Sequence, residues 1–294
     1  MKKFVKFLVS AILAVSMLGC LTACEEPPKE VFVGFDTDLA KAVGEELGLE
    51  IEFVEINWDL KESLLNSEEV DLVWNGFTYT EDRDNGYFDE DRNQQIGGLD
   101  FTNFYMENKQ VAVVRKSEVA NYTSNASFAG KIGCAEASSA GAKVISTILG
   151  QTANELPKQI DTFTAVKAGT CDYAVIDSSM ASVYVQSSNG AYNKDLAVVQ
   201  LAGVEVEYYA VGCKQGSNLV SVVNYALAKA YKSGKATQIA NNYGLGGVLF
   251  DGFSGIDTDS FQLPTDGQYK KCADKGKIVV GYTLFAPMNY FELR

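Results

Sequence analysis

Apolar and polar residues recur with two different periods in the first part of this 294-residue chain. Residues 35–47 carry apolar side chains at helical spacing, and Gly48 follows where a helix commonly ends. Residues 50–56 instead alternate apolar with charged side chains, which is typical of a half-buried strand. Helix-like and strand-like segments continue to alternate toward the C-terminus, so the pattern predicts an α/β fold with covered sheets.

The same criteria predict the later elements. Apolar runs predict further strands at 70–74, 110–115, 131–135, 173–176, 208–213 and 277–283. Helical spacing predicts further helices at 60–65, 140–149, 163–168 and 219–242, the last with a break near Gly234. Residues 84–98 are polar and contain turn signals, which predicts a surface insertion. Residues 244–266 are rich in Gly, Asp and Ser, and we interpret 244–272 as a linker.

The N-terminus has the features of an export signal. A Lys-rich start precedes an apolar run over 7–18 that is too short to span a bilayer comfortably, so 1–23 is interpreted as a signal peptide. Residues 21–24, Leu-Thr-Ala-Cys, resemble a bacterial lipobox, which makes Cys24 the expected lipid-attachment residue. The alternative is an ordinary secretory signal cleaved near Ala23. Residues 24–30 would form a tether, and acyl chains would be the only membrane contact.

Composition argues against several classes of function. A net charge of −13 argues against nucleic acid or an anionic membrane surface as a partner. The sequence has no histidine, which removes histidine-based triads, histidine metal ligands and a histidine pH switch. Cys134, Cys171, Cys213 and Cys272 follow the signal region without metal-like spacing and without a reason to pair any two. We therefore expect neither a metal nor a cofactor.

Groups suited to binding an anion gather in residues 75–83. Gly76 follows a predicted buried strand and lets the backbone approach a ligand closely. Thr78 offers a hydroxyl, and Arg83 offers a rigid fork of donors that matches a carboxylate. The alternative for Arg83 is an ordinary arginine in a surface loop.

Two further segments place polar groups at the ends of predicted strands. Ser138 and Ser139 stand where a strand runs into a helix, so they predict either an anion site at the helix N-terminus or plain N-capping. Asp177 ends the apolar run that starts at Tyr173, and a buried carboxylate there needs a partner. We favour a ligand contact for Asp177 over a helix N-cap.

The segment 75–83 resembles the signature of the polar amino-acid-binding family, extracellular solute-binding proteins that serve ABC importers. The resemblance implies that Arg83 clamps the ligand α-carboxylate, with help from Thr78 and from Ser138 and Ser139. It implies that Asp177 holds the α-ammonium group. It also implies aromatic walls from Trp58 and Phe285, although either ring alone is as readily a core residue. The family usually has Gly where Ala137 stands, so the backbone differs there.

The order of the segments departs from that family. Residues 277–283 and 285–291 resemble the opening of such a protein, and 31–40 resemble its continuation. The resemblance therefore implies a circularly permuted, two-lobed periplasmic-binding-protein-like α/β fold whose usual first strand is C-terminal. One lobe would comprise 31–108 and 210–294, and the other 109–209. Hinges would fall near 109–111 and 207–209.

The resulting hypothesis is a lipid-anchored, monomeric binding protein on the extracellular face of the bacterial cytoplasmic membrane. It would capture a polar amino acid between its lobes and deliver it to an ABC permease. One alternative is a dehydratase-like enzyme on the same scaffold, with an acid or base such as Glu136 or Asp177. Others are an amino-acid sensor and one member of a tandem pair. The sequence does not select among amino acids.

Overall fold

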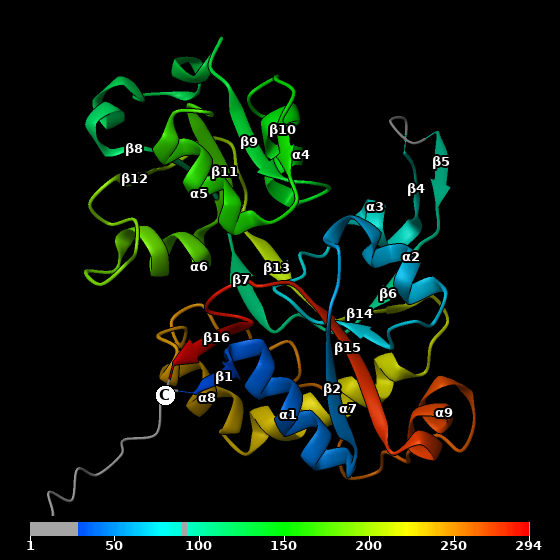
Figure 1. Ribbon diagram of the computed structural model, residues 1–294. Coiled ribbons are helices and arrows are strands. Elements are labelled where there is room, and N and C mark those ends of the chain that lie inside the picture. The colour runs from blue at the N-terminus through cyan, green and yellow to red at the C-terminus, as the bar shows by residue number, and fades with distance from the viewer. Residues whose placement is uncertain (1–28, 90–92, 294) are drawn as a thin grey trace, which may run out of the picture.

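The computed structural model describes residues 29–89 and 93–293. The expected signal peptide, Cys24 and most of the tether lie outside the described residues. Figure 1 shows two α/β lobes, each built around its own sheet, with a pair of short strands between them. Within the described ranges, no helix is both long and apolar enough to cross a bilayer.

The larger lobe contains a mixed five-stranded sheet, with the order β2-β15-β3-β14-β6. Its strands are β2 (Glu50–Glu55), β15 (Lys277–Tyr282), β3 (Leu72–Val73), β14 (Gly212–Lys214) and β6 (Leu99–Phe101). The C-terminal strand β15 runs parallel to both β2 and β3, with Ile278 opposite Ile51 and Val280 opposite Leu72. Because it lies between β2 and β3, β15 is an interior strand of this sheet, and most of its side chains are buried.

Helices cover this sheet on both sides. They are α1 (Phe35–Leu47), η1 (Trp58–Leu60), α2 (Lys61–Asn66), α3 (Glu81–Asn85), α7 (Leu219–Lys232), α8 (Lys235–Asn242) and α9 (Gly267–Lys275). Helix α1 packs against α7 and α8 through its apolar stripe. Gly234 adopts a left-handed conformation between α7 and α8, which explains the break expected near that residue.

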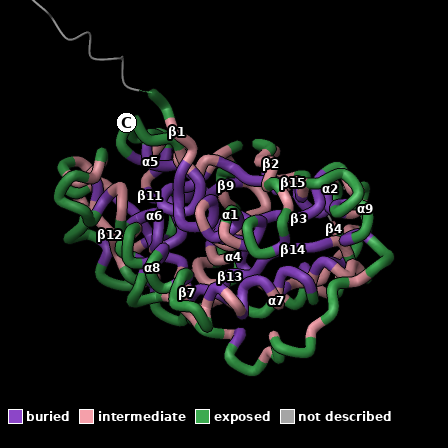
Figure 2. The backbone as a smooth tube through the Cα atoms, turned by 90° about the horizontal axis from the view of Figure 1, so that it is seen from below, coloured by how far each residue is buried: buried purple, intermediate pink, exposed green. Residues whose placement is uncertain are grey.

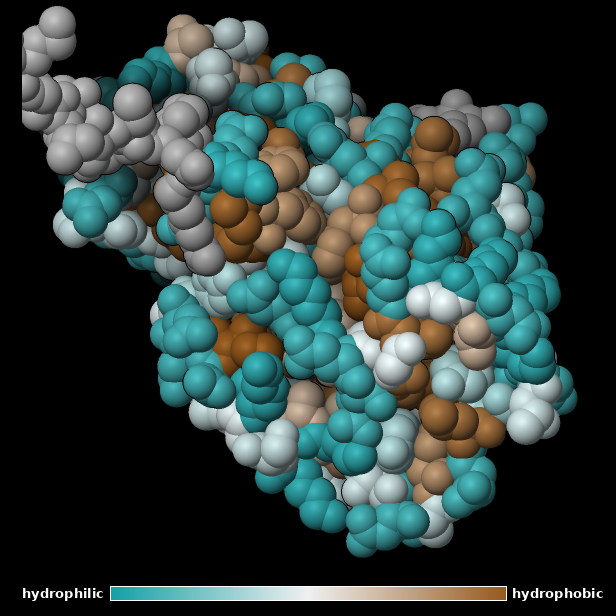
Figure 3. All heavy atoms as spheres, turned by 60° about the horizontal axis from the view of Figure 1, so that its bottom comes forward, coloured by the Kyte–Doolittle hydropathy of each residue, from teal (hydrophilic) through white to brown (hydrophobic). Residues whose placement is uncertain are grey.

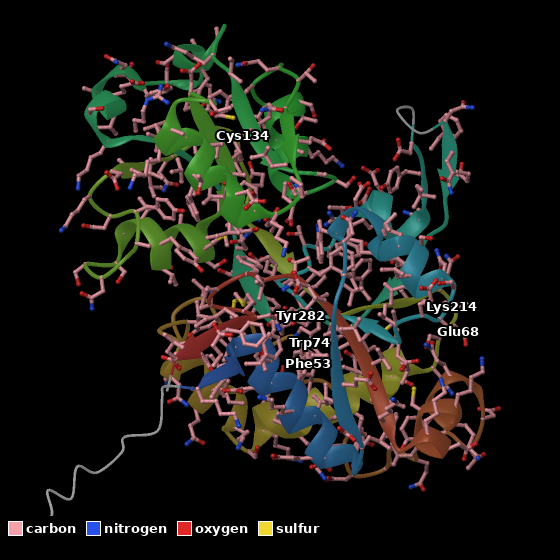
Figure 4. The ribbon with its side chains drawn as sticks, viewed as in Figure 1. Phe53, Glu68, Trp74, Cys134, Lys214 and Tyr282 are labelled. Atoms are coloured by element: carbon pink, nitrogen blue, oxygen red, sulfur yellow. The ribbon has the colours of Figure 1, made fainter. Side chains whose placement is uncertain are left out.

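The two ends of the described chain pair with each other. Strand β1 (Glu30–Val33) is antiparallel to β16 (Tyr290–Leu293), and Glu30 lies opposite Leu293. The Phe32 ring packs on Phe53, Tyr282 and Phe291, with ring centroids 4.5–5.2 Å apart. Figure 4 labels Phe53 and Tyr282 in this region, with the label of Trp74 between theirs.

The smaller lobe, green in Figure 1, has a second five-stranded sheet in the order β10-β9-β11-β8-β12. Its strands are β8 (Gln110–Arg115), β9 (Gly133–Glu136), β10 (Asn154–Leu156), β11 (Tyr173–Asp177) and β12 (Leu196–Val199). Helical segments surround it: η2 (Lys116–Asn121), η3 (Asn125–Phe128), α4 (Ala140–Thr147), α5 (Gln159–Ala168), α6 (Ser178–Ala181) and η4 (Ser182–Gln186). Strands β9 and β11 are parallel, so their C-terminal ends meet at one sheet edge.

Two antiparallel strands join the lobes: β7 (Met106–Asn108) and β13 (Glu207–Tyr209). We expected one strand at 208–213, whereas the structure divides it into β13 and β14, which belong to different sheets. An apolar run does not show where the chain passes from one sheet to another, because Ala210 and Val211 are buried on the way. The first connection between the lobes lies at 106–108, just before the hinge expected at 109–111.

Two surface segments complete the chain. The polar stretch 84–98 contains a hairpin of β4 (Tyr87–Asp89) and β5 (Gln94–Ile96), which projects from the larger lobe in Figure 1. Residues 250–266 contain no helix or strand, but α9 begins at Gly267. The linker therefore ends at 266 and not at the expected 272. Only three side chains of α9 are buried, Gln268, Tyr269 and Cys272, which gave the sequence too little apolar periodicity to predict this helix.

Buried residues follow the two sheets through the centre of the molecule (Figure 2). The four cysteines of the described region are buried and unpaired; Figure 4 labels Cys134 inside the smaller lobe. Hydrophilic side chains cover much of the face in Figure 3, and the hydrophobic ones between them form small patches. Such a surface is consistent with the strongly acidic composition.

Candidate ligand-binding site

A small cavity of about 20 Å³ lies between the two lobes. This volume is about the space that one water molecule requires. Its lining comprises Trp58, Asn75, Gly76, Thr78, Arg83, Glu136, Ser139, Ala140, Gln159, Asp177 and Phe285. Seven of the eight ligand-contact candidates from the sequence are among these residues, and the eighth, Ser138, contacts Arg83 beside the cavity. The structure therefore brings together residues more than 200 positions apart.

Gly76 lines the cavity in the loop that follows β3. Its backbone has a φ of 56°, and an added Cβ would lie 2.5 Å from the Phe285 ring. Only glycine allows this aromatic ring to lie against the backbone here. The buried carboxylate of Asp36 accepts the Gly76 N–H at 2.6 Å and the Tyr105 hydroxyl at 2.9 Å. Burial raises the pKa of Asp36 to about 7, and these hydrogen bonds oppose the rise.

Arg83 is fixed from two sides. Its guanidinium lies 4.8 Å from the Phe77 ring centroid and donates to the Thr78 carbonyl oxygen at 2.6 Å. A second nitrogen crosses to the smaller lobe and donates to the Ser138 carbonyl oxygen at 3.1 Å. The side chain is buried, and Thr80 caps the short helix α3 that carries it by accepting the Arg83 N–H at 3.2 Å. The donor fork thus points toward the opposite lobe.

The two serines serve different purposes. Ser138 adopts a left-handed backbone with a φ of 56°, a conformation that costs a non-glycine residue about 1–2 kcal/mol. Its hydroxyl donates to Asp59 at 2.6 Å across the cleft. Ser139 caps α4 by accepting the Ala142 N–H at 3.2 Å, which is the N-capping alternative. In this conformation the Ser138 carbonyl, rather than either hydroxyl, faces Arg83.

Asp177 ends β11 as a buried carboxylate. One oxygen accepts from Asn108, from Gln110 at 2.8 Å and from the Tyr209 hydroxyl at 2.9 Å. The other accepts from Gln159 at 2.7 Å. Burial raises the pKa of Asp177, and the hydrogen bonds of these four side chains oppose the rise. Its side chain makes no N-cap hydrogen bond to α6, and its partners come from β8, from the start of α5 and from the hinge strands.

Glu207 is a site residue that the sequence analysis missed. It lies on hinge strand β13, and its carboxylate accepts from Asn108 and Gln110 at 2.6 Å each and from Thr78 at 3.3 Å. Burial and the neighbouring Asp177 raise the pKa of Glu207 to about 7. The two carboxylates share the same amide donors. No local pattern around 207 predicts this, because the donors come from β7 and β8.

A second charged group was also missed. Lys61 at the start of α2 is completely buried, pairs with Glu62 at 3.2 Å and lies 5.1 Å from the Trp58 ring centroid. It also donates to the Ser138 carbonyl oxygen at 3.4 Å. Burial lowers the pKa of Lys61 to about 8, and the Coulomb attraction of Glu62 opposes that decrease. A lysine in an amphipathic helix normally lies on the surface, so the burial of Lys61 was not predictable from the sequence.

The aromatic walls come from opposite ends of the chain. Trp58 is 6% exposed and contacts Phe77 edge to face at 5.1 Å. Phe285 belongs to the loop after β15, and Asn75 ties this loop to the site by donating to the Thr283 carbonyl at 2.8 Å and to Asn289 at 2.6 Å. The C-terminal segment therefore supplies one wall of the cavity.

Across 29–89 and 93–293, no cluster of three or more histidine, cysteine, aspartate or glutamate residues has a geometry that could hold a metal ion. The cavity instead combines a fixed guanidinium, buried carboxylates and aromatic rings. This combination suits an organic ligand that carries both charges.

Two α/β lobes, joined by two strands around a charged cavity, define a cleft-type solute-binding protein. The chain belongs to the bacterial extracellular solute-binding proteins, family 3, whose family model matches residues 25–246. The match ends before α9 and β15.

Named relatives and solved structures are consistent with this membership. A probable histidine-binding protein of Neisseria gonorrhoeae is 27% identical over 71% of this chain and 74% of its own length. The arginine-binding extracellular protein ArtP of Bacillus subtilis is 24% identical over 83% and 98%. An ABC uptake transporter substrate-binding protein from Streptococcus pneumoniae with bound histidine has a TM-score of 0.61 at 30% identity, covering 78% and 85%. The arginine-, lysine-, histidine-binding protein ArtJ of Geobacillus stearothermophilus has a TM-score of 0.64 at 26% identity, covering 74% and 88%.

Proposed function

We propose that this chain is a substrate-binding protein that captures a polar amino acid between its lobes and delivers it to an ABC transporter permease. The observation that carries the proposal is that Arg83 of one lobe and Asp177 of the other line one cavity. A guanidinium and a carboxylate are complementary to the two charged groups of an amino acid. Family membership and the relatives named for binding histidine and arginine support it.

Each lining residue has a role in this proposal. Arg83 binds the α-carboxylate, which replaces the Ser138 carbonyl as acceptor of the guanidinium N–H. Asp177 binds the α-ammonium group, with Thr78 and the Gly76 backbone beside it. Trp58 and Phe285 enclose the side chain, and Ser139 places the N-terminus of α4 at the cavity. No step of bond making or breaking is involved.

Ligand entry requires the lobes to separate. The cavity has about the volume of one water molecule, which is smaller than any amino acid. The connections available for bending are the hinge strands β7 and β13, whose pairing involves only three residues each. Residues at these strands therefore act as the hinge in our proposal.

We also propose that the segments are permuted relative to the family. The support is that β15, which follows all the other strands of the larger sheet in the chain, occupies an interior position between β2 and β3. The pairing of β1 with β16 places Glu30 next to Leu293, where a continuous chain would join them. In this arrangement 31–108 and 210–294 build one lobe and 109–209 the other.

The setting that we propose is the extracellular face of the bacterial cytoplasmic membrane, with a monomer attached through lipid on Cys24. The support is the lipobox-like sequence ending at that residue and the extracellular character of the family. Two or more acyl chains would hold the protein stably. Radiolabelled palmitate incorporation that disappears in Cys24→Ser would support this anchor, and incorporation that persists would contradict it.

A thermal-shift screen over the twenty amino acids tests the proposed function. A true ligand at 100 times its dissociation constant stabilises the folded state by about 2.7 kcal/mol. For a protein of this size we expect a rise in Tm of several degrees with one group of polar amino acids and none with the aliphatic ones. If no amino acid raises Tm, the proposed function is wrong.

A further inference from the structure

Glu136 places an unsatisfied oxygen at the cavity. The residue ends β9, is 5% exposed and lines the space between the lobes. Its Oε1 atom has no hydrogen-bond partner. A buried carboxylate oxygen without a partner is costly, so it indicates a group that arrives from outside.

Carboxyl groups outnumber cationic groups around the cavity. Two cations, Lys61 and Arg83, face a larger set of buried or partly buried carboxylates: Glu62, Glu136, Asp177 and Glu207. Lys61 forms an ion pair with Glu62, and no other lysine or arginine of the described ranges lies within ion-pair distance of the remaining three. Arg83 donates to backbone carbonyls.

An ordinary amino acid does not offset this excess of carboxyl groups. Its α-carboxylate and α-ammonium cancel, and in the proposed function they use Arg83 and Asp177. Glu207 already accepts three hydrogen bonds from Thr78, Asn108 and Gln110. Glu136 is thus the carboxylate that still has an acceptor atom available for a second positive charge.

We propose that the ligand is an amino acid with a positively charged side chain, and that Glu136 is the specificity residue that binds this charge. The inference rests on the proposed function and narrows its ligand class. Lys61 does not fill the role itself, because its ammonium group is 3.2 Å from Glu62 and belongs to the lobe that moves away on opening. The side-chain cation would enter between the rings of Trp58 and Phe285, where cation–π attraction adds to the ion pair.

Calorimetry with arginine, lysine and glutamine tests this inference on the intact protein. We expect the unmodified protein to prefer arginine or lysine over glutamine by at least roughly tenfold. Glu136→Gln should weaken binding of the preferred cation by roughly 30-fold or more, and should change the affinity for glutamine by less than about threefold. Glu45→Gln, which neutralises an exposed carboxylate on α1, is the matched control and should change neither affinity.

The possible outcomes separate the inference from the function on which it rests. If no amino acid binds the unmodified protein, the proposed function is wrong and the inference falls with it. If glutamine binds as tightly as arginine and lysine, or if Glu136→Gln binds the cation unchanged, only the inference is wrong. Should Glu136→Gln fail to fold by circular dichroism, Glu136→Asp replaces it. That variant keeps the charge on a shorter chain, and the preference for the cation should weaken yet persist.

Discussion

At the scale of single residues, Gly76 determines whether this part of the cavity lining can form. Both its left-handed backbone and the Phe285 ring at its Cα exclude a side chain. We expect Gly76→Ala to lower the free energy of unfolding by about 1–2 kcal/mol through backbone strain and to abolish ligand binding because Phe285 must move. Chemical denaturation and calorimetry measure the two effects.

Gly130 supplies the control for that substitution. It also has a positive φ, 73°, but an added Cβ would meet nothing within 4 Å. Gly130→Ala should therefore cost similar stability and leave ligand binding intact. If both variants bind the ligand equally well, the position of the Phe285 ring does not depend on the absence of a side chain at Gly76.

Glu136 also makes ligand binding depend on pH. Burial, followed by the carboxylate of Asp177, raises the pKa of Glu136 to about 8, and Lys61 lowers it. A cationic ligand stabilises the ionised form, so binding requires proton loss at neutral pH. Affinity for such a ligand should therefore rise with pH between about 6 and 8, by up to about tenfold per unit, and level off above 8.

Other charged or ionisable groups lie near Glu136. They are Asp177 and Asp161 in its own lobe, Lys61 in the other lobe, and Glu207 on the hinge, whose pKa is raised to about 7. Calorimetry in buffers of different ionisation enthalpy should show protons released on binding. Glu136→Gln should flatten the profile, and an affinity that falls as the pH rises would contradict the assignment.

At the scale of elements, the larger sheet depends on β15, which lies between β2 and β3. Removal of 267–293 takes an interior strand with buried Ile278 and Val280 from the larger sheet. The shortened chain should not unfold cooperatively, since the strands on both sides lose their hydrogen-bonded neighbour. Urea unfolding followed by circular dichroism tests this expectation.

Moving the same segment tests the proposed permutation directly. When 267–293 precedes Glu30 through a short Gly-containing turn, β16 and β1 become a hairpin, because Leu293 and Glu30 are already paired. This rearranged chain should fold and bind the ligand within about threefold of the original affinity. Failure to fold would show that the order of segments matters beyond their positions.

The sequence predicted those parts of the fold and site whose signals are local. The stretch from Gly76 to Arg83 is contiguous, so its donors could be named together, and Asp177 ends an apolar strand. The division between β13 and β14 was not predictable, because buried residues continue across the change of sheet. Lys61 and Glu207 were missed because their burial depends on partners from other elements. The contact between the Ser138 carbonyl and Arg83 was not predicted, because residue type does not indicate the direction in which a backbone carbonyl points.

At the scale of the whole molecule, two kinds of polar contact connect the lobes. Ion pairs lie at the exposed rim of the cleft, and hydrogen bonds lie inside it. The exposed pair of Lys158 and Glu55, 2.5 Å apart, joins the lobes and contributes about 0–1 kcal/mol. Inside, Arg83 reaches Ser138, and Ser138 reaches Asp59. Because these polar contacts are few, we expect the lobes to separate by bending at the hinge strands.

Ligand binding should therefore shift the molecule toward its compact form. Small-angle scattering should give a smaller radius of gyration with saturating ligand than without it. Asp177→Asn, which weakens the contact to the ammonium group, should require more ligand for the same change. An identical scattering curve with and without bound ligand would argue against closure.

The claim that one amino acid bridges Arg83 and Asp177 is tested most directly by calorimetry with a bound amino acid and its α-amide, which lacks the carboxylate charge. The unmodified protein should bind the acid more tightly than the amide by roughly 30-fold or more. Arg83→Ala should lose most of its affinity for the acid and should no longer distinguish it from the amide. An Arg83→Ala variant that folds normally and still prefers the acid by the original factor would contradict the account.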